Sequence, residues 1–209
     1  MEIGTLELVL SKTEVVWRHL LDAAEGGVRR HSSLSALAID LGLGVSTVHK
    51  ALSVPVDIGA VIVKPSGGVR VIDPYRVGVL WAGKRRFDRD LLDEFTTDIS
   101  APEVERRVGL DGVILGGFGA VVARLGRNRI ADYESVTVYA DPSTIRTAVN
   151  PTDAGRTRVL VVEPDPWLAR YGRVTPLHQA WVDLFHQPDW QAARFTEALT
   201  TRWVTTDAA

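Results

Sequence analysis

Hydrogen-bonding and basic side chains gather in the first seventy residues at spacings that suit contact with nucleic acid. Four polar residues share one side of a short predicted helix: Ser46, Thr47, His49 and Lys50. Five further basic residues flank that helix: Arg29, Arg30, His31, Lys64 and Arg70. Polar groups on an exposed helix can read base edges in the major groove, and neighbouring cations can bind phosphates. These nine residues therefore favour contact with double-stranded DNA, and a solvated face used for protein contacts is the alternative.

Two acids in the second half offer a different chemistry, which is metal-assisted nucleotidyl transfer. Asp132 and Glu134 follow the glycine cluster at 116–119, and alternate residues of a strand point the same way, so both carboxylates can share Mg²⁺. The match to such a site is poor, because Glu replaces a second Asp, Ser135 interrupts the strand and a third carboxylate is lacking. We therefore expect a tight strand-to-helix turn at the glycines and a solvated corner at the acids. No catalytic residue, metal site or cofactor is predicted.

Composition and missing motifs exclude several other chemistries. Cysteine is absent, which removes disulfides and thiolate chemistry. The histidines do not form a metal-ligand pattern such as H-E-x-x-H, and no serine lies in a G-x-S-x-G elbow. A dinucleotide-binding fingerprint is excluded because Val122 stands where glycine or alanine is needed. The acids Glu163 and Asp165 fall in a proline-rich turn, and we assign them to turn structure.

Local patterns predict three helices that would position the polar and basic residues of the first part. Ser11 and Glu14 form a capping box, and the helix that they open ends at Gly26-Gly27. Ser33 is a good N-cap for a second helix, and a glycine-containing turn at 42–44 separates this helix from a third. Helix, short glycine turn and helix is the spacing of a helix-turn-helix. We expect proline at position 55 to limit the third helix.

A hairpin is predicted directly after the third helix. The runs AVIVK and VRVID are rich in β-branched residues and flank the turn at Pro65-Ser66-Gly67-Gly68. Three helices followed by a hairpin is the order of a winged helix-turn-helix. We predict this domain for residues 1–75.

The rest of the chain is predicted to form a helical connector and an α/β domain, which makes the fold class α+β. Apolar residues at helical spacing indicate a connector over 76–99: Phe87, Leu91, Leu92, Phe95 and Ile99. A second capping box, at Ser100 and Glu103, opens the C-terminal domain, predicted for 100–209. Strands and helices then alternate, as in GVILGG, SVTVYAD and RTRVLVVEPDP. We expect this second domain to fold alone.

Charge is distributed unevenly between the two parts. Residues 1–86 carry 11 Lys and Arg against 8 Asp and Glu, whereas residues 87–209 carry 13 against 18. A basic front part suits DNA contact, and an acidic second part suits a basic surface on a protein partner. Apolar runs fall short of the ~20 residues that cross a bilayer. Glu2 and Glu7 do not fit a signal peptide, so we expect no membrane contact and a cytoplasmic protein.

The chain as a whole resembles the AbiEi-type antitoxins, which are winged-helix regulators of abortive-infection (type IV) toxin–antitoxin systems. In the first part the resemblance rests on LSALAIDLGLGVSTVHKAL and on the end of the hairpin at VIDP. In the second part it rests on GGFGAVVARLGRNRIADYESVTVYAD, then VLVVEPDP, then VTPLHQAWVDLF followed by a final helix. The resemblance implies autorepression of a toxin–antitoxin operon by the first domain. It also implies antitoxin activity of the second domain against a nucleotidyltransferase-like toxin.

Two functional hypotheses follow from the sequence. The first is a sequence-specific, double-stranded DNA-binding transcriptional repressor that acts as the antitoxin of its operon and is not an enzyme. The second is a nucleotidyltransferase-like enzyme that the winged helix tethers to DNA. Metal-dependent incorporation of labelled nucleotides would distinguish the second from the first.

Overall fold

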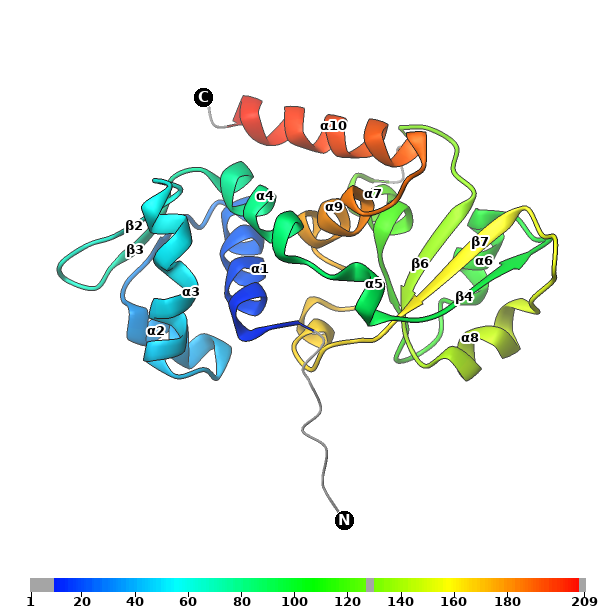
Figure 1. Cartoon of the computed structure of the whole chain (residues 1–209), viewed down its shortest axis with the longest axis horizontal. Helices are drawn as coiled ribbons and strands as arrows, with labels where there is room; N and C mark the ends of the chain where they lie inside the picture. Colours follow the sequence, from blue (N-terminus) through cyan, green and yellow to red (C-terminus); the bar gives the residue numbers. More distant parts are fainter. Residues whose placement is uncertain (1–9, 127–129, 207–209) are drawn as a thin grey trace, which may run out of the picture.

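The computed structural model describes residues 10–126 and 130–206, so Glu2 and Glu7, which bear on the signal-peptide prediction, lie outside the described residues. Over these ranges the protein is a mixed α+β fold with ten α-helices and two small sheets (Figure 1). The helices are α1 (Lys12–Glu25), α2 (Leu34–Leu41), α3 (Val45–Asp57), α4 (Pro74–Lys84), α5 (Phe87–Asp90), α6 (Ala101–Arg107), α7 (Gly117–Arg124), α8 (Pro142–Val149), α9 (Leu177–Phe185) and α10 (Trp190–Thr206). The strands are β1 (Arg30–His31), β2 (Val61–Val63), β3 (Val69–Val71), β4 (Leu91–Thr97), β5 (Ile114–Leu115), β6 (Ser135–Tyr139) and β7 (Thr157–Val162).

The predicted caps form at the first two helices. The Ser11 hydroxyl accepts from the Glu14 amide and the Glu14 carboxylate accepts from the Ser11 amide, which is the predicted capping box. Ser33 accepts from the amide of Ala36 and starts α2. Gly42 ends α2 with a positive φ of 64°, a conformation that favours glycine. The predicted helix, turn and helix are therefore present.

Pro55 lies inside α3, which continues for two residues beyond it and ends at Asp57. A proline inside a helix lacks the amide that would bond the carbonyl four residues earlier, here that of Ala51. The Trp17 indole of α1 donates to this same carbonyl at 2.7 Å. A neighbouring helix thus supplies the hydrogen bond that the proline removes.

The hairpin forms as predicted and joins a third short strand. β2 and β3 pair antiparallel, and β1 pairs with the other edge of β3, so the strand order is β1-β3-β2. Val61, Val69 and Val71 are buried on one face of this small sheet. They join the same hydrophobic cluster as α1, α2 and α3.

The connector predicted as helical over 76–99 is wrong for its second half, because β4 occupies Leu91–Thr97. Apolar residues at 87, 91, 95 and 99 are four apart, and a spacing of four fits a period of two as well as a helical turn. Two features favour the strand, which are the β-branched side chains of Thr96 and Thr97 and the pairing of this segment with β7. β4 is an edge of the second sheet, of order β4-β7-β6-β5, so a fragment that starts at Ser100 lacks a strand of its own sheet.

The strand-to-helix turn at the glycine cluster is confirmed. Gly117 has a φ of 49°, and a Cβ atom there would lie 2.8 Å from the Thr137 hydroxyl oxygen. The second predicted capping box does not form, since the Ser100 side chain makes no cap hydrogen bond. Glu103 instead binds Arg106 and Arg107 of α6.

The two parts of the chain pack on one continuous core. Helices α7 and α9 lie between the larger sheet and the N-terminal helices, and α10 runs across α9 and α4 (Figure 1). One hydrophobic cluster includes residues from both parts, such as Trp17, Trp81 and Trp181. Among the described residues no single helix is long and apolar enough to cross a membrane. Only α2 and α3 taken together pass that test, and they are bent by 112° relative to each other.

Candidate nucleic-acid interface

The third helix exposes the side that the sequence predicted. Ser46, His49 and Lys50 are exposed, while Thr47 is half-buried. The opposite side of α3 is buried against α1 and α2: Val48, Ala51 and Leu52. Helical periodicity thus places hydroxyl, imidazole and ammonium groups together on one surface that no other described element covers.

Two arginines form a row on the exposed face of the small sheet. Arg30 of β1 and Arg70 of β3 are directly opposite each other, and Ile62 of β2 is the next residue in the row. All three are exposed. Residues opposite each other in a sheet project from the same face, so the two guanidinium groups add their charges on one surface. Lys64 is exposed at the hairpin turn, where its amide donates to the carbonyl of Gly68.

His31 does not share this surface, which corrects its place in the predicted set. Successive strand residues point to opposite faces, so His31 points away from the face that Arg30 occupies. Its ring lies 5.8 Å from that of His19 of α1, and burial lowers the pKa of both imidazoles. His31 therefore belongs to the packing between β1 and α1.

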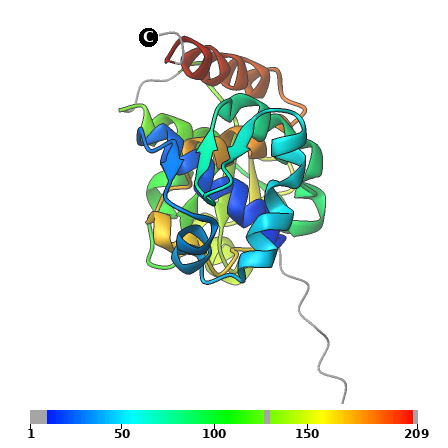
Figure 2. The same cartoon turned by 90° about the vertical axis from the view of Figure 1, so that its left-hand side faces the viewer.

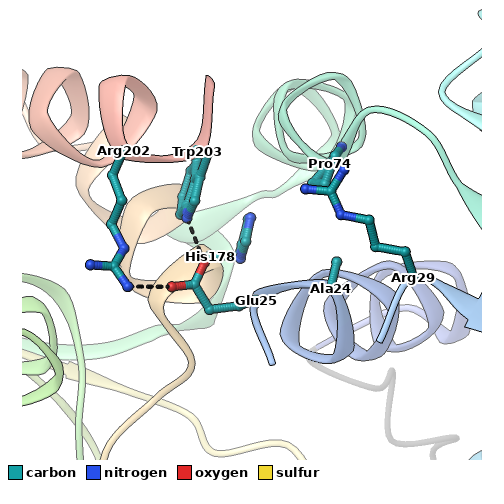
Figure 3. Close-up of a pocket in the computed structure, with 7 residues that line it drawn as sticks. All are labelled: Ala24, Glu25, Arg29, Pro74, His178, Arg202 and Trp203. Carbon is teal, nitrogen blue, oxygen red and sulfur yellow. Dashed lines mark hydrogen bonds and ion pairs between the residues drawn. The ribbon is translucent and has the colours of Figure 1, made fainter. Parts of the chain in front are cut away.

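Arg29 also leaves the predicted surface. Its side chain is half-buried and lines a pocket with Pro74 at the start of α4 (Figure 3). This pocket faces α9 and α10 rather than the exposed side of α3. The structure therefore brings together seven of the nine predicted residues: Arg30, Ser46, Thr47, His49, Lys50, Lys64 and Arg70.

These seven residues lie at one end of the molecule. α3 and the β2–β3 hairpin project away from the larger sheet in Figure 1, and Figure 2 looks onto this end. Four of the seven carry a permanent positive charge and are exposed: Arg30, Lys50, Lys64 and Arg70. Asp57, at the end of α3, is an exposed acid on the same helix. These seven residues thus contribute four permanent positive charges to this end of the molecule.

The alternative acid pair does not form a recognisable metal centre. Asp132 and Glu134 are both exposed and precede β6 rather than lying within it. Glu134 lines a pocket that Arg156 and Arg158 also line, and cations beside a carboxylate disfavour a metal ion there. Over residues 10–126 and 130–206, no group of three or more potential ligands is arranged to hold a metal ion.

A buried ionic network at the junction of the two parts was missed by sequence reasoning. Arg18 of α1 binds Asp165 through two contacts, of 2.7 and 2.8 Å, and donates to Gln179 at 3.0 Å. Arg85, after α4, forms a buried ion pair with Asp90. Arg18 sits one residue after Trp17 on the buried side of its helix, and no spacing in the sequence links it to an acid 147 residues away.

Asp183 is the titrating member of this junction that we expect to affect stability most. It lies on α9, accepts from the Tyr139 hydroxyl at 2.8 Å and is fully buried. Burial raises its pKa to about 6 from the usual 3.8, although Arg85 and Arg18 lower it. Between these two values the folded state binds more protons than the unfolded state does. The free energy of unfolding should therefore fall as pH rises through this window, by up to about 3 kcal/mol.

The Asp183→Asn variant tests this expectation. It keeps an oxygen that can accept from Tyr139 but removes the titration. Urea unfolding at pH values from about 4 to about 7 should show a flatter stability profile for the variant than for the wild type. Parallel profiles would mean that Asp183 titrates near its usual value.

No family model matches this sequence, and searches of the curated proteins and of the solved structures found no match either.

Proposed function

We propose that residues 12–73 form a winged helix-turn-helix that binds double-stranded DNA, with α3 in the major groove and the β2–β3 hairpin as the wing. The observation that carries the proposal is the position of α3 beside a sheet of order β1-β3-β2. This arrangement puts the polar side of α3 and the Arg30–Arg70 row at the same end of the molecule. A helix in the major groove needs both kinds of group, because base edges give specificity and phosphates give affinity.

The helix contributes the base-reading groups in this proposal. Ser46, Thr47 and His49 offer hydroxyl and imidazole groups that can hydrogen-bond with base edges. Lys50 on the same side can bind a guanine edge or a phosphate. Arg30 and Arg70 lie on the small sheet and Lys64 lies at its turn, outside the helix that enters the groove in this proposal, so these three residues bind the phosphate backbone.

We further propose that the protein is the autorepressing antitoxin of a toxin–antitoxin operon. This part rests on the resemblance to AbiEi-type antitoxins and on the acidic balance of residues 87–209. An acidic surface repels DNA and complements a basic protein partner, here a nucleotidyltransferase-like toxin. The enzyme alternative is less favoured, because Arg156 and Arg158 lie beside Glu134 where a metal-binding carboxylate would be needed. A nucleotidyltransferase-like gene next to that of the protein would support the antitoxin role.

Substitutions in the helix and in the sheet should affect DNA binding differently. Arg70→Ala should weaken specific and non-specific DNA alike, because it removes a phosphate contact and reduces the salt slope by about one. His49→Ala should cost about 1–3 kcal/mol on the preferred sequence and much less elsewhere. Fluorescence anisotropy on a selected site and on a scrambled duplex measures both effects.

Arg146→Ala is the matched control for these variants. Arg146 is an exposed arginine on α8, where it binds Asp93 of the larger sheet, far from α3 (Figure 1). Its loss should leave DNA binding unchanged. Equal losses on every sequence for His49→Ala would show that α3 does not read bases, and a loss for Arg146→Ala equal to that of Arg70→Ala would place the DNA elsewhere.

A further inference from the structure

A short segment of the second part, residues 165–171, contacts the helix-turn-helix of the first part. It follows β7 and contains a 3₁₀-helix, η1 (Leu168–Tyr171). Leu168 is fully buried, in a hydrophobic cluster that also contains Leu160 and Val162 of β7. These apolar contacts anchor the segment to the larger sheet. Its polar and aromatic groups contact α1 and α2 instead.

Both ends of the segment contact Arg18 of α1. The Asp165 carboxylate binds this guanidinium through two contacts, of 2.7 and 2.8 Å, and also accepts from the Trp167 amide at 3.0 Å. The guanidinium carbon of Arg18 lies 5.0 Å from the centre of the Tyr171 ring. A cation above an aromatic ring is attracted to it. The segment is thus fixed to α1 as well as to the larger sheet.

Two side chains of the same segment cap the end of α2. The last four carbonyls of a helix lack amide partners within it. In α2 the amide of Gly42 bonds with the first two of the four. The third, that of Asp40, accepts from the Arg170 guanidinium at 2.9 Å. The fourth, that of Leu41, accepts from the Trp167 indole at 3.1 Å. The second part of the chain therefore satisfies the last two carbonyls of α2.

This cap lies next to the start of α3. The turn at 42–44 is all that separates Leu41 from Val45, the first residue of α3. Two of the residues proposed to read bases, Ser46 and Thr47, follow directly. A hydrogen bond to a base edge needs a distance near 3 Å and good alignment, whereas attraction to phosphates acts over a longer range. A small shift of α3 would therefore remove base contacts and leave the charge attraction in place.

We propose that Trp167 and Arg170 are positioning residues for DNA recognition, through which the second part of the chain fixes α3 relative to α2. The inference rests on the proposed function, because it concerns α3 in the major groove. In this role neither residue touches DNA. Binding to the preferred sequence depends on the two capping hydrogen bonds, and binding to other sequences does not.

Two variants of the full chain test this role. Trp167→Phe keeps an aromatic ring and removes the indole donor, whereas Arg170→Met keeps a long side chain and removes the guanidinium. Each should weaken binding to a duplex selected by the wild type from a random library by about fivefold or more, which is the loss of roughly one base contact. Binding to a scrambled duplex should change by less than about twofold, because it depends on charge. Fluorescence anisotropy measures both affinities.

Arg173→Met is the matched control. Arg173 is another exposed arginine two residues after the segment, and it also donates to a backbone carbonyl, that of Gly109, at 2.5 Å. This carbonyl belongs to the second part, so the variant removes the same charge without touching α2. It should keep the wild-type ratio of the two affinities.

The ratio of the two affinities separates positioning from other roles. A smaller folded fraction, which melting curves measure, would lower both affinities equally. A phosphate contact by Arg170 would also lower both, and it would reduce the salt slope by about 0.9. Either pattern, or an unchanged ratio in a folded variant, would overturn the inference and leave the proposed function intact. Arg170 is exposed, so Arg170→Met decides the matter if Trp167→Phe does not fold. A wild type that binds neither duplex would instead reject the proposed function itself.

A double-mutant cycle gives a second readout. Thr47→Ala should cost less affinity for the selected duplex in the Trp167→Phe background than in the wild type, because a displaced α3 has already weakened that contact. Equal costs in the two backgrounds would mean that the cap and α3 act independently, which would contradict the proposed positioning role.

Discussion

Raising the salt concentration from about 50 to about 200 mM is expected to weaken DNA binding roughly 150-fold. Each cation that neutralises a phosphate contributes a slope near −0.9 to the dependence of log K on log salt. Four permanent charges are exposed on the proposed interface: Arg30, Lys50, Lys64 and Arg70. Together they give a slope of about −3.6 for one copy of the chain on one site.

This expectation depends on where the structure places the basic residues. A count from the sequence alone would add Arg29 as a fifth permanent charge. In the structure Arg29 lines the pocket beside Pro74 instead. Anisotropy measurements at four or five salt concentrations give the slope directly. The double variant Arg30→Ala with Arg70→Ala should reduce it to about −1.8, since two of the four contacts are removed. A binding constant that does not change with salt would contradict the electrostatic part of the proposed function.

Arg18→Met is expected to destabilise the protein by about 3–5 kcal/mol. Arg18 and Asp165 have side-chain exposures of 0% and 1%, and two short contacts join them. Methionine fills much of the space of the arginine stem but leaves the Asp165 carboxylate buried without its cation. The cost of an uncompensated buried charge exceeds what the methionine gains by packing.

Arg146→Met is the matched control, because Arg146 also binds its acid, Asp93, through two contacts, of 2.6 and 2.8 Å, but lies on the surface. The Arg146 side chain is 48% exposed, and an ion pair between solvent-exposed side chains contributes little to stability. Urea unfolding at neutral pH compares the two variants. If Arg18→Met lost no more stability than Arg146→Met, the junction would not depend on this pair. Asp165→Leu added to Arg18→Met should recover part of the loss, because it removes the orphaned charge.

Local rules were sufficient for the N-terminal elements. The capping box at Ser11, the N-cap at Ser33 and the glycine turn at 42–44 each depend on hydrogen bonds or dihedral angles within a few residues. The hairpin also follows from its own turn and from two β-branched runs. The outward side of α3 follows from helical periodicity, since burying Val48 and Leu52 leaves His49 and Lys50 exposed.

Sequence periodicity failed where two structures satisfy the same spacing. Phe87, Leu91 and Phe95 are four residues apart, which places them on one side of a helix or on one face of a strand. Pairing with β7, more than 60 residues later, selected the strand. A local pattern also could not show that Pro55 lies inside α3, because the Trp17 indole that compensates for it comes from another helix.

Only the tertiary structure decided which polar residues are exposed and which are buried at the junction between the two parts of the chain. Sequence by itself assigned Asp165 to a turn, and its carboxylate does accept from the Trp167 amide, but its pairing with Arg18 joins residues 147 positions apart. Pairing in the small sheet turned His31 away from the face that Arg30 occupies, and Arg29 lines the pocket beneath α10. Charge and hydrogen-bonding capacity are properties of a residue type and can be read from the sequence. Whether a residue is buried, and which residues it contacts, depends on packing between segments far apart in the chain, which only the tertiary structure defines.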